Sequence, residues 1–291
     1  MKILINLIGE QPIPNLLPIL HFNPDKTIVM HTQRTLAVAL RLQKIVKNIE
    51  LVSTRPFDFP ENIKKLHSIY EDSGDYIFNI TGGTKIMSVA LFQFALEKKA
   101  KVVYLESQNN INKLVYVVEN NEISNQVEVI SELIDVDTYI KAHVSNYYLA
   151  QPKNPNLFGV KFENAIIQTI KSNGFEVLQG VKPKKEGDQL EIDAVIKKKG
   201  TNNFAIVEVK SGGEDEKRKQ GIDQLSTAGS REYLGIYTKR ILISRRKVND
   251  SLKKLANKHN IVVIDQIYTD KKIQIKEKEK IKLITKLNDI L

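Results

Sequence analysis

Short apolar runs alternate with amphipathic segments along the first hundred residues of the chain. Apolar runs of strand length lie at 2–8, 27–30, 50–53, 76–80 and 101–106. Segments with apolar residues at helical spacing separate these runs, at 15–21, 32–47, 61–71 and 86–98. Strands that alternate with helices at short intervals predict a parallel sheet covered on both faces. We therefore expect an α/β fold for this part of the chain.

The pattern changes after residue 106. Strands at 113–118 and 122–129 flank Asn120-Asn121 and predict a hairpin at the edge of the sheet, and an amphipathic helix follows at 135–144. The stretch 146–156 contains Pro152 and Pro155 and has no periodicity, which is typical of a domain boundary. We expect one domain at 1–145, a short linker at 146–156 and a second domain at 157–291.

The second half of the chain predicts another α/β unit with a different order of elements. Helices are expected at 157–172, 215–228, 247–258 and 277–291, and strands at 175–181, 190–196, 203–209, 240–244 and 261–264. The strands 190–196 and 203–209 flank a turn-like Lys-Lys-Lys-Gly-Thr-Asn-Asn and form a predicted hairpin. After the linker, the expected order therefore begins with a helix, three strands, a helix and a strand.

Composition excludes several classes of protein. The chain has 291 residues, 42% hydrophobic and 27% charged, which suits a soluble protein with two cores. No run approaches the roughly 18 apolar residues of a membrane span, and the start does not resemble a signal peptide. The absence of cysteine excludes disulfides and thiolate metal sites. We expect a cytoplasmic protein that does not act at a membrane.

The net charge of +10 is unevenly distributed along the chain. Residues 1–150 contain 15 Lys and Arg and 16 Asp and Glu, a net charge of −1, whereas residues 151–291 contain 29 and 18, a net charge of +11. A basic half favours a phosphodiester partner, since Lys and Arg gain affinity by displacing counterions from nucleic acid. A general richness in lysine is the alternative explanation.

The predicted hairpin carries acidic residues and a lysine where its strands end. Glu208 and Lys210 alternate with Val209 and so share a face, and Asp193 on the neighbouring strand can face them. Charged groups at the end of an apolar hairpin are unfavourable to bury without a partner. A divalent cation is such a partner, and Mg²⁺ and Mn²⁺ prefer oxygen ligands. The alternative is a half-buried hairpin whose charges only cap the edge of a sheet.

These residues resemble the PD-(D/E)XK nuclease superfamily, whose core is an Asp on one strand and Glu-X-Lys on the next. The resemblance implies a restriction-endonuclease-like α/β domain in which Asp193, Glu208 and the Val209 carbonyl hold Mg²⁺ or Mn²⁺, with Lys210 beside the attacking water. It also implies roles for Glu163 on the preceding helix, as a further metal-side acid, and for Gln224 on the following helix. Glu191 lies two residues before Asp193 and can share or replace its role.

A second chemical feature lies in the first half, where Thr81-Gly82-Gly83-Thr84-Lys85 links a predicted strand to a helix. The glycines allow close approach of a ligand, the threonine can cap the helix, and the helix N-terminus and Lys85 favour an anion. The sequence matches neither the Walker pattern nor GxGxxG. A simple strand–turn–helix corner is the alternative explanation.

The sequence LIGEQPIPN near the start, TGGTKIM after a later strand and the nuclease-like core together resemble the CRISPR-associated Rossmann-fold (CARF) sensor nucleases of type III CRISPR defence. The resemblance implies a Rossmann-like CARF domain with a parallel sheet that binds a cyclic oligoadenylate as an allosteric activator across a homodimer. Cyclic tetra-adenylate is the ring we expect, although the sequence does not specify the ring size. The resemblance also implies a binding site lined by Gln11, Pro12, Asn15, Thr81, Gly82, Gly83, Thr84, Lys85 and Met87. Met87 can equally belong to the helix core.

Three functional hypotheses follow from the sequence. The first is a cyclic-oligoadenylate-activated, metal-dependent endonuclease that cuts DNA, RNA or both in antiviral defence. The second is a sensor and nucleic-acid-binding regulator whose nuclease core does not cut. The third is a resolvase-like or restriction-like nuclease that acts without an activator.

Overall fold

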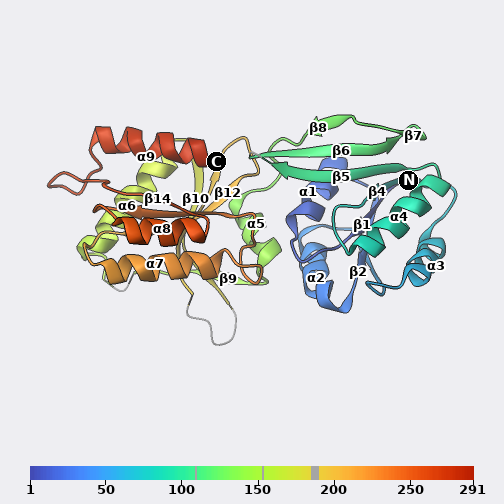
Figure 1. Cartoon of the computed structure of the whole chain (residues 1–291), viewed down its shortest axis with the longest axis horizontal. Helices are drawn as coiled ribbons and strands as arrows, with labels where there is room; N and C mark the ends of the chain where they lie inside the picture. Colours follow the sequence, from blue (N-terminus) through green and yellow to red (C-terminus); the bar gives the residue numbers. More distant parts are fainter. Residues whose placement is uncertain (109, 153, 185–189) are drawn as a thin grey trace. The chain divides into compact units, whose positions relative to one another are not determined.

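The computed structural model describes residues 1–108, 110–152, 154–184 and 190–291. They form two compact units, Met1–Ile134 and Asp135–Leu291, each with its own sheet (Figure 1). None of the helices in these ranges is both long and apolar enough to cross a membrane.

The sheet of the first unit has the strand order β3-β2-β1-β4-β5-β6-β7, with β8 paired to β6. The strands from β3 to β5 are parallel, and β6 runs antiparallel to β5. The bounds are β1 Lys2–Leu7, β2 Lys26–His31, β3 Ile49–Ser53, β4 Asp75–Asn79, β5 Lys101–Gln108, β6 Ile111–Glu119, β7 Glu122–Ile123 and β8 Val127–Val129. The predicted parallel α/β sheet with a hairpin at its edge is confirmed.

Helices cover both faces of this sheet. They are α1 Ile13–Phe22, α2 Leu36–Ile45, α3 Phe59–Ile69 and α4 Lys85–Glu97. Figure 1 shows α1 and α2 on one side of the sheet and α3 and α4 on the other. The predicted helix 32–47 is shorter, because a 3₁₀ turn, η1 Gln33–Thr35, precedes α2. The Thr32 N–H donates to Thr35 Oγ1 at 3.0 Å and so stabilises that turn.

The second unit is a mixed six-stranded sheet with the order β14-β13-β12-β11-β10-β9. β12, β13 and β14 are parallel, whereas β9 to β12 are antiparallel. The bounds are β9 Tyr147–Leu149, β10 Phe175–Pro183, β11 Ile192–Lys198, β12 Phe204–Lys210, β13 Lys239–Ser244 and β14 Ile261–Ile264. The predicted hairpin is the β11–β12 pair at the centre of the sheet.

The helices of the second unit are α5 Val136–His143, α6 Phe158–Lys171, α7 Asp215–Ala228, α8 Asp250–Lys258 and α9 Glu277–Ile290. Buried residues of α6 and α9 share a hydrophobic core with alternate residues of β11, β12 and β13. Helix α7 packs on β12 and β13, and Figure 1 shows α7 and α8 together on the face opposite α6 and α9. Residues 206, 208 and 210 of β12 therefore face α7.

The compact units divide between Ile134 and Asp135, before the stretch 146–156 that the sequence predicted as a linker. Helix α5 lies in the second unit because Tyr139 is buried there: its ring stacks on Phe204 at 3.9 Å, and its hydroxyl donates to the Leu234 carbonyl at 2.8 Å. The stretch 146–156 itself contributes an edge strand, β9, to the second sheet. A proline pair therefore follows the division of the two units instead of marking it.

Candidate functional site

Strand β12 ends with a buried acid beside a half-buried lysine. The Glu208 side chain is only 2% exposed, and its Oε1 accepts a hydrogen bond from the Lys210 ammonium. The two side chains point the same way because they are two positions apart on one strand. The predicted alternation of residues 208 to 210 is thus present in the structure.

Asp193 lies on β11, the neighbouring antiparallel strand. Its Oδ2 accepts a hydrogen bond of 2.7 Å from the Val209 backbone N–H. The strands pair Ala194 with Val207, a register that sets Asp193 opposite the end of β12. Asp193, Glu208 and Lys210 therefore lie together, as the sequence predicted.

Glu163 approaches this group from helix α6. Its Oε1 accepts a hydrogen bond of 2.9 Å from Gln179 Nε2, and the same amide nitrogen donates to Asn164 Oδ1 at 2.7 Å. Sequence reasoning missed Gln179, which lies on β10 and pairs in register with Ala194. Its only signal in the sequence is a polar amide inside a strand that is otherwise largely apolar.

Glu191, the alternative acid, has a different partner. Its Oε2 forms an ion pair of 2.6 Å with Lys182 Nζ, and its side chain is 45% exposed. It precedes β11, whereas Asp193 lies within the strand. The geometry therefore favours Asp193 over Glu191 as the acid that faces Glu208.

Helix α7 closes the group on its other side. Gln224 Oε1 accepts from Lys210 Nζ at 3.4 Å, so the predicted glutamine does reach the lysine. Gly221, one turn earlier, was not predicted. A Cβ at this position would lie 3.0 Å from Lys210 Cε and 3.2 Å from Glu208 Cγ. Because glycine has no Cβ, the Glu208 and Lys210 side chains can pack directly against α7 at this position.

Burial and mutual repulsion perturb the three carboxylates. Burial raises the pKa of Glu208 to about 7 despite the opposing effect of Lys210, and it also raises the pKa of Glu163. The pKa of Asp193 is raised well above its ordinary value by burial and by the charges of Glu208 and Glu163. Burial alone would lower the pKa of Lys210, but Glu208 and Asp193 outweigh it and the pKa is raised. The site thus concentrates more negative charge than one lysine neutralises.

The donor chemistry suits a hard divalent cation, although the side chains do not form a complete cage. In the described parts of the chain, no group of three or more His, Cys, Asp or Glu has the geometry to hold a metal. One oxygen of each carboxylate already accepts a hydrogen bond: Asp193 Oδ2 from the Val209 N–H, and Glu208 Oε1 from the Lys210 ammonium. The second oxygen of each carboxylate is the kind of ligand that Mg²⁺ and Mn²⁺ take, with water completing their coordination. The raised pKa values express an excess of negative charge that such a cation would relieve.

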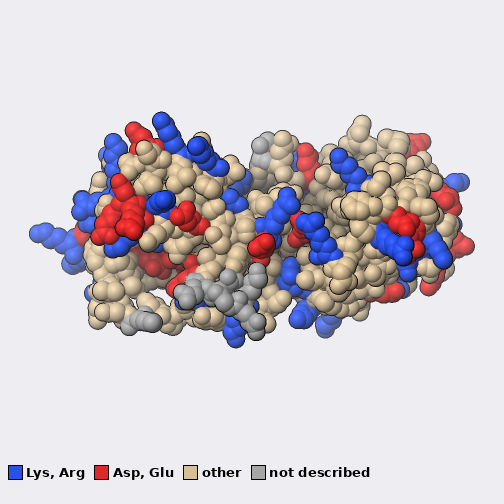
Figure 2. Space-filling view, turned by 60° about the horizontal axis from the view of Figure 1, so that its bottom comes forward, with Lys and Arg blue, Asp and Glu red and all other residues tan. Residues whose placement is uncertain are grey.

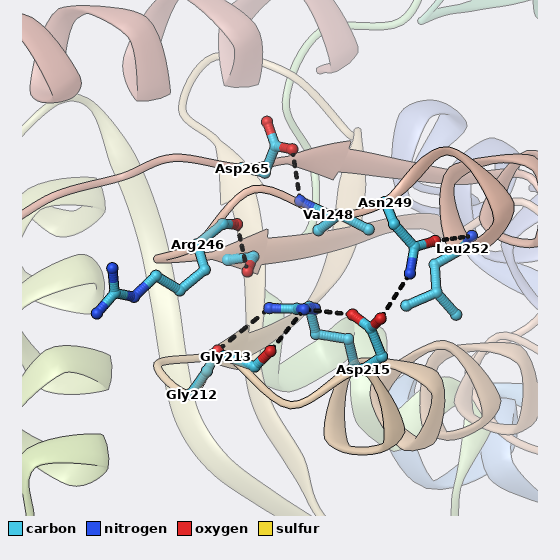
Figure 3. Close-up of polar contacts among 10 residues, drawn as sticks. Gly212, Gly213, Asp215, Arg246, Val248, Asn249, Leu252 and Asp265 are labelled. Atoms are coloured by element: carbon cyan, nitrogen blue, oxygen red, sulfur yellow. Dashed lines mark hydrogen bonds and ion pairs between the residues drawn. The ribbon is translucent and has the colours of Figure 1, made fainter.

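The loop after Lys210 is fixed by a buried arginine (Figure 3). Arg218 is 4% exposed and donates to the Gly212 and Gly213 carbonyls at 3.3 and 2.8 Å. It also forms an ion pair with Asp215, whose Oδ2 accepts from Asn249 Nδ2 at 2.7 Å. Asn249 in turn caps α8. This network ties the loop that follows the acid–lysine pair to the starts of α7 and α8.

In the first unit, the loops after β1 and β4 meet at the carboxyl edge of the sheet. β1 lies between β2 and β4, so the strand order reverses direction at the β1–β4 pair, where open α/β sheets bind ligands. A Cβ on Gly82 would lie 2.0 Å from the Leu7 carbonyl oxygen, and Gly83 has φ of +75°. Both positions therefore require glycine for the loops to pack against each other.

Helix α4 begins at this junction. Thr84 caps it: its Oγ1 accepts from the Met87 N–H at 3.3 Å and donates to the Pro56 carbonyl. Lys85 is exposed at the first position of the helix, which adds a full charge to the positive end of the helix dipole. The Met87 side chain is 1% exposed and belongs to the hydrophobic core, so it does not lie at the surface of the junction.

Buried amides beneath the same junction lack partners. Both polar atoms of the Gln11 side chain, and Asn15 Oδ1, are buried without a hydrogen bond to any described residue. Asn15 Nδ2 donates to the Leu7 carbonyl at 2.8 Å, and Pro12 is the N-cap residue of α1. Thr81 Oγ1 lies 2.5 Å from Asn79 Oδ1. Unpaired buried amides are unfavourable unless a ligand or ordered water supplies the missing partners.

Basic side chains are dispersed over the visible face of the protein, where they alternate with acidic ones (Figure 2). The excess charge of the second half therefore does not form one patch on that face. Attraction of nucleic acid to the second half therefore has to depend on particular basic side chains near the acid–lysine group.

Residues 3–139 match the family described as the Card1 CARF domain. The CARF resemblance predicted from the sequence is thereby confirmed for this part of the chain. No curated protein matches the sequence.

Several solved structures share the fold of the whole chain. Can2 from Sulfobacillus thermosulfidooxidans, solved in complex with cyclic tetra-adenylate, is 15% identical with a TM-score of 0.76, and the match covers 99% of this chain and 96% of Can2. Protein VC1899 from Vibrio cholerae is 9% identical with a TM-score of 0.73, over 99% and 98% of the two chains. A type III CRISPR defence DNA nuclease activated by cyclic oligoadenylate is 15% identical with a TM-score of 0.66, over 98% of this chain and 52% of that one. At sequence identities of 9–15%, these matches show that the proteins share a fold.

Proposed function

From the premise that residues 3–139 are a Card1-type CARF domain, we propose that the protein is a metal-dependent nuclease switched on by a cyclic oligoadenylate. The observation that carries the proposal is the grouping of Asp193, Glu208 and Lys210 at the end of the β11–β12 hairpin. Glu163 and Gln224 adjoin the group from the two flanking helices. The fold that this chain shares with Can2 and with a cyclic-oligoadenylate-activated DNA nuclease supports the same function.

In this proposal Asp193, Glu208 and the Val209 carbonyl hold Mg²⁺ or Mn²⁺, and Glu163 contributes directly or through water. A bound divalent cation supplies Lewis-acid activation of the scissile phosphate and of a water molecule. The ammonium of Lys210 orients the attacking water and stabilises the charge that develops on the phosphate. Gln224 and Gly221 keep the lysine in place, the first by accepting its hydrogen bond and the second by leaving it space.

We propose that the activator, cyclic tetra-adenylate, binds at the β1–β4 junction. Lys85 and the N-terminus of α4 attract its phosphates, Gly82 and Gly83 allow the backbone to approach it, and Gln11 supplies buried amide groups that lack partners among the described residues. Pro12, Asn15, Thr81 and Thr84 fix the two loops. Binding shifts the population toward a form whose nuclease site engages nucleic acid.

A homodimer belongs to this proposal. A ring with two-fold symmetry can satisfy two identical sites across a two-fold axis. The exposed apolar side chains Ile86, Val89 and Leu96 lie along α4, the helix that starts at the ligand junction, and support a second copy at this face. Sedimentation equilibrium and calorimetry together should show two chains per bound ring; one ring per single chain would rule this arrangement out.

The test of the function is cleavage of labelled single- and double-stranded DNA and RNA with a panel of cyclic adenylates. We expect cutting only when a ring of the correct size and Mg²⁺ or Mn²⁺ are both present, and no cutting after chelation with EDTA. Activity without any ring would support the ungated nuclease instead.

One observation favours a second candidate function. The described acidic residues do not form a complete metal cage, and Lys210 already neutralises Glu208. A sensor that binds nucleic acid without cutting it would need no metal. Binding of both ligands without metal-dependent turnover under any of these conditions would establish that function.

A further inference from the structure

An aromatic ring and an arginine pack together at the start of helix α6. Phe158, the first residue of α6, is 40% exposed, and the Arg245 guanidinium carbon lies 4.7 Å from the centre of its ring. The ring is nearly parallel to that of the fully buried Phe162, with 11° between the planes and 6.4 Å between the centres. The core beneath therefore fixes the orientation of an exposed aromatic ring.

This pair adjoins the acid–lysine group through two independent connections. The Arg245 backbone N–H donates to the Lys210 carbonyl at 3.0 Å. On the helix side, a Cβ added to Gly159 would lie 3.3 Å from Ser211 Oγ, so the start of α6 lies against the residue that follows Lys210. An exposed ring thus lies near the end of β12, the strand that carries the acid–lysine pair.

The arginine is followed by further basic side chains, and one of its nitrogen atoms makes no hydrogen bond within the described residues. That atom, Nε, is buried. The next two residues, Arg246 and Lys247, are exposed, and Figure 3 shows the Arg246 side chain extending away from the Arg218–Asp215–Asn249 network. The arginine that packs on the ring is therefore followed in the chain by two exposed basic side chains, as suits the binding of an anionic strand.

Nucleobases are the flat, uncharged groups that a phosphodiester strand brings to such a surface. Exposed aromatic rings stack with bases of any sequence, and arginine adds cation–π attraction. The faces of a base inside a duplex are covered by its neighbours, so only an unpaired or extruded base can stack on the ring.

We propose that Phe158 and Arg245 form a base-stacking subsite for a nucleotide next to the phosphate that is cut. The inference rests on the proposed function, because it assumes a nucleic-acid strand at the acid–lysine group. In this inference both residues bind the substrate strand, and the binding requires an aromatic ring at position 158.

The experiment measures binding without cutting, so that it does not depend on turnover. Single-stranded DNA with one 2-aminopurine is titrated with the full-length protein in EDTA and cyclic tetra-adenylate, and the 2-aminopurine is moved along the strand in successive oligonucleotides. Stacking on Phe158 should quench the fluorescence at one position. Phe158→Leu should abolish that quenching and weaken binding about 5- to 100-fold, whereas Phe158→Trp should retain both.

Tyr237→Leu is the matched control, since it removes a 56% exposed aromatic from the same unit. Arg245→Gln, which leaves the ring in place, should weaken binding and keep part of the quenching, and it provides a second test if Phe158→Leu does not fold. Equal binding and quenching in wild type, Phe158→Leu and Arg245→Gln would overturn the inference. Failure of the proposed function shows separately, as quenching without any metal-dependent cleavage by the wild type.

Discussion

At the scale of single residues, the site raises the question of which acid on the β11 side acts with Glu208. The sequence allowed Glu191 or Asp193, because both lie on the same face of an extended strand. The structure separates them: Glu191 pairs with Lys182 near the surface, and Asp193 accepts from the Val209 N–H beside Glu208.

Substitution distinguishes the two acids in function. Asp193→Asn should reduce cleavage at least about 100-fold, by analogy with the loss of one group that stabilises charge in the transition state. Glu191→Gln should change it less than about threefold, since an exposed ion pair contributes little. Initial rates at saturating activator and metal measure both, and the reverse order of effects would assign the ligand role to Glu191.

The pKa of Glu208 predicts how the stability of the metal-free protein depends on pH. The group has a pKa of about 7 in the folded state and an ordinary value of 4.5. Below pH 4.5 the carboxyl is protonated in both the folded and the unfolded state, so it does not change the free energy of unfolding. As the pH rises toward 7 and beyond, the unfolded chain ionises more readily, so this carboxyl destabilises the fold progressively.

Glu208→Gln removes that destabilisation. Its free energy of unfolding relative to wild type should therefore increase by about 2–3 kcal/mol between pH 5 and pH 8. Urea titrations of both proteins in EDTA measure the difference. A difference that stays constant over this range would show that Glu208 ionises normally.

At the scale of elements, two helices depend on glycines at close contacts. Gly221→Ala in α7 would stabilise an isolated helix by up to about 1 kcal/mol. The added Cβ would, however, press on Lys210 and Glu208 from 3.0 and 3.2 Å. We expect cleavage to fall roughly tenfold, as a small displacement of a positioned group does, while the melting temperature changes little.

The control for Gly221→Ala is Asp223→Ala, an exposed position two residues further along the same helix. It should leave the rate unchanged. Equal rates for Gly221→Ala and wild type would mean that the space under α7 is not needed for catalysis.

Gly82→Ala tests the junction of β1 and β4. Its Cβ would collide with the Leu7 carbonyl oxygen, whereas a Cβ on Gly9 meets only ordinary contacts at 3.7 and 3.8 Å. Gly82→Ala should displace the loop before α4 and weaken cyclic tetra-adenylate binding at least about tenfold, as expected for a loss of one or more kcal/mol. Calorimetry measures the affinity, and Gly9→Ala serves as the control for the melting temperature. Unchanged affinity in Gly82→Ala would locate the ligand elsewhere.

Elements near the middle of the chain show where prediction from sequence ended. The strands and helices with strong periodicity, such as β1, β12 and α7, were found within a residue or two. No sequence signal marks the division of the compact units after Ile134, because Ile134-Asp135 carries no proline or glycine. Helix α5 is held by Tyr139, whose partners Phe204 and Leu234 are far away in sequence. Gln179 and Gly221 were missed for the same reason: their contacts depend on strand register and helix packing.

At the scale of the whole molecule, the chain joins a unit that matches the Card1 CARF domain to a second α/β unit that carries the acid–lysine group. The sequence predicted two α/β units because their motifs follow regular strands. The proposed roles depend on tertiary geometry that motifs do not specify, such as the distance between carboxylates. We therefore expect nucleic-acid cleavage by the second unit to depend on a cyclic oligoadenylate bound to the first unit.

The most direct measurement is single-turnover cleavage of a labelled single-stranded substrate by wild type and Glu208→Gln, with cyclic tetra-adenylate and Mg²⁺ or Mn²⁺ each present or omitted. We expect cleavage by wild type only when both are present, and none above background by Glu208→Gln under any condition. Cleavage by Glu208→Gln at the wild-type rate, or by wild type at full rate without the ring, would contradict it.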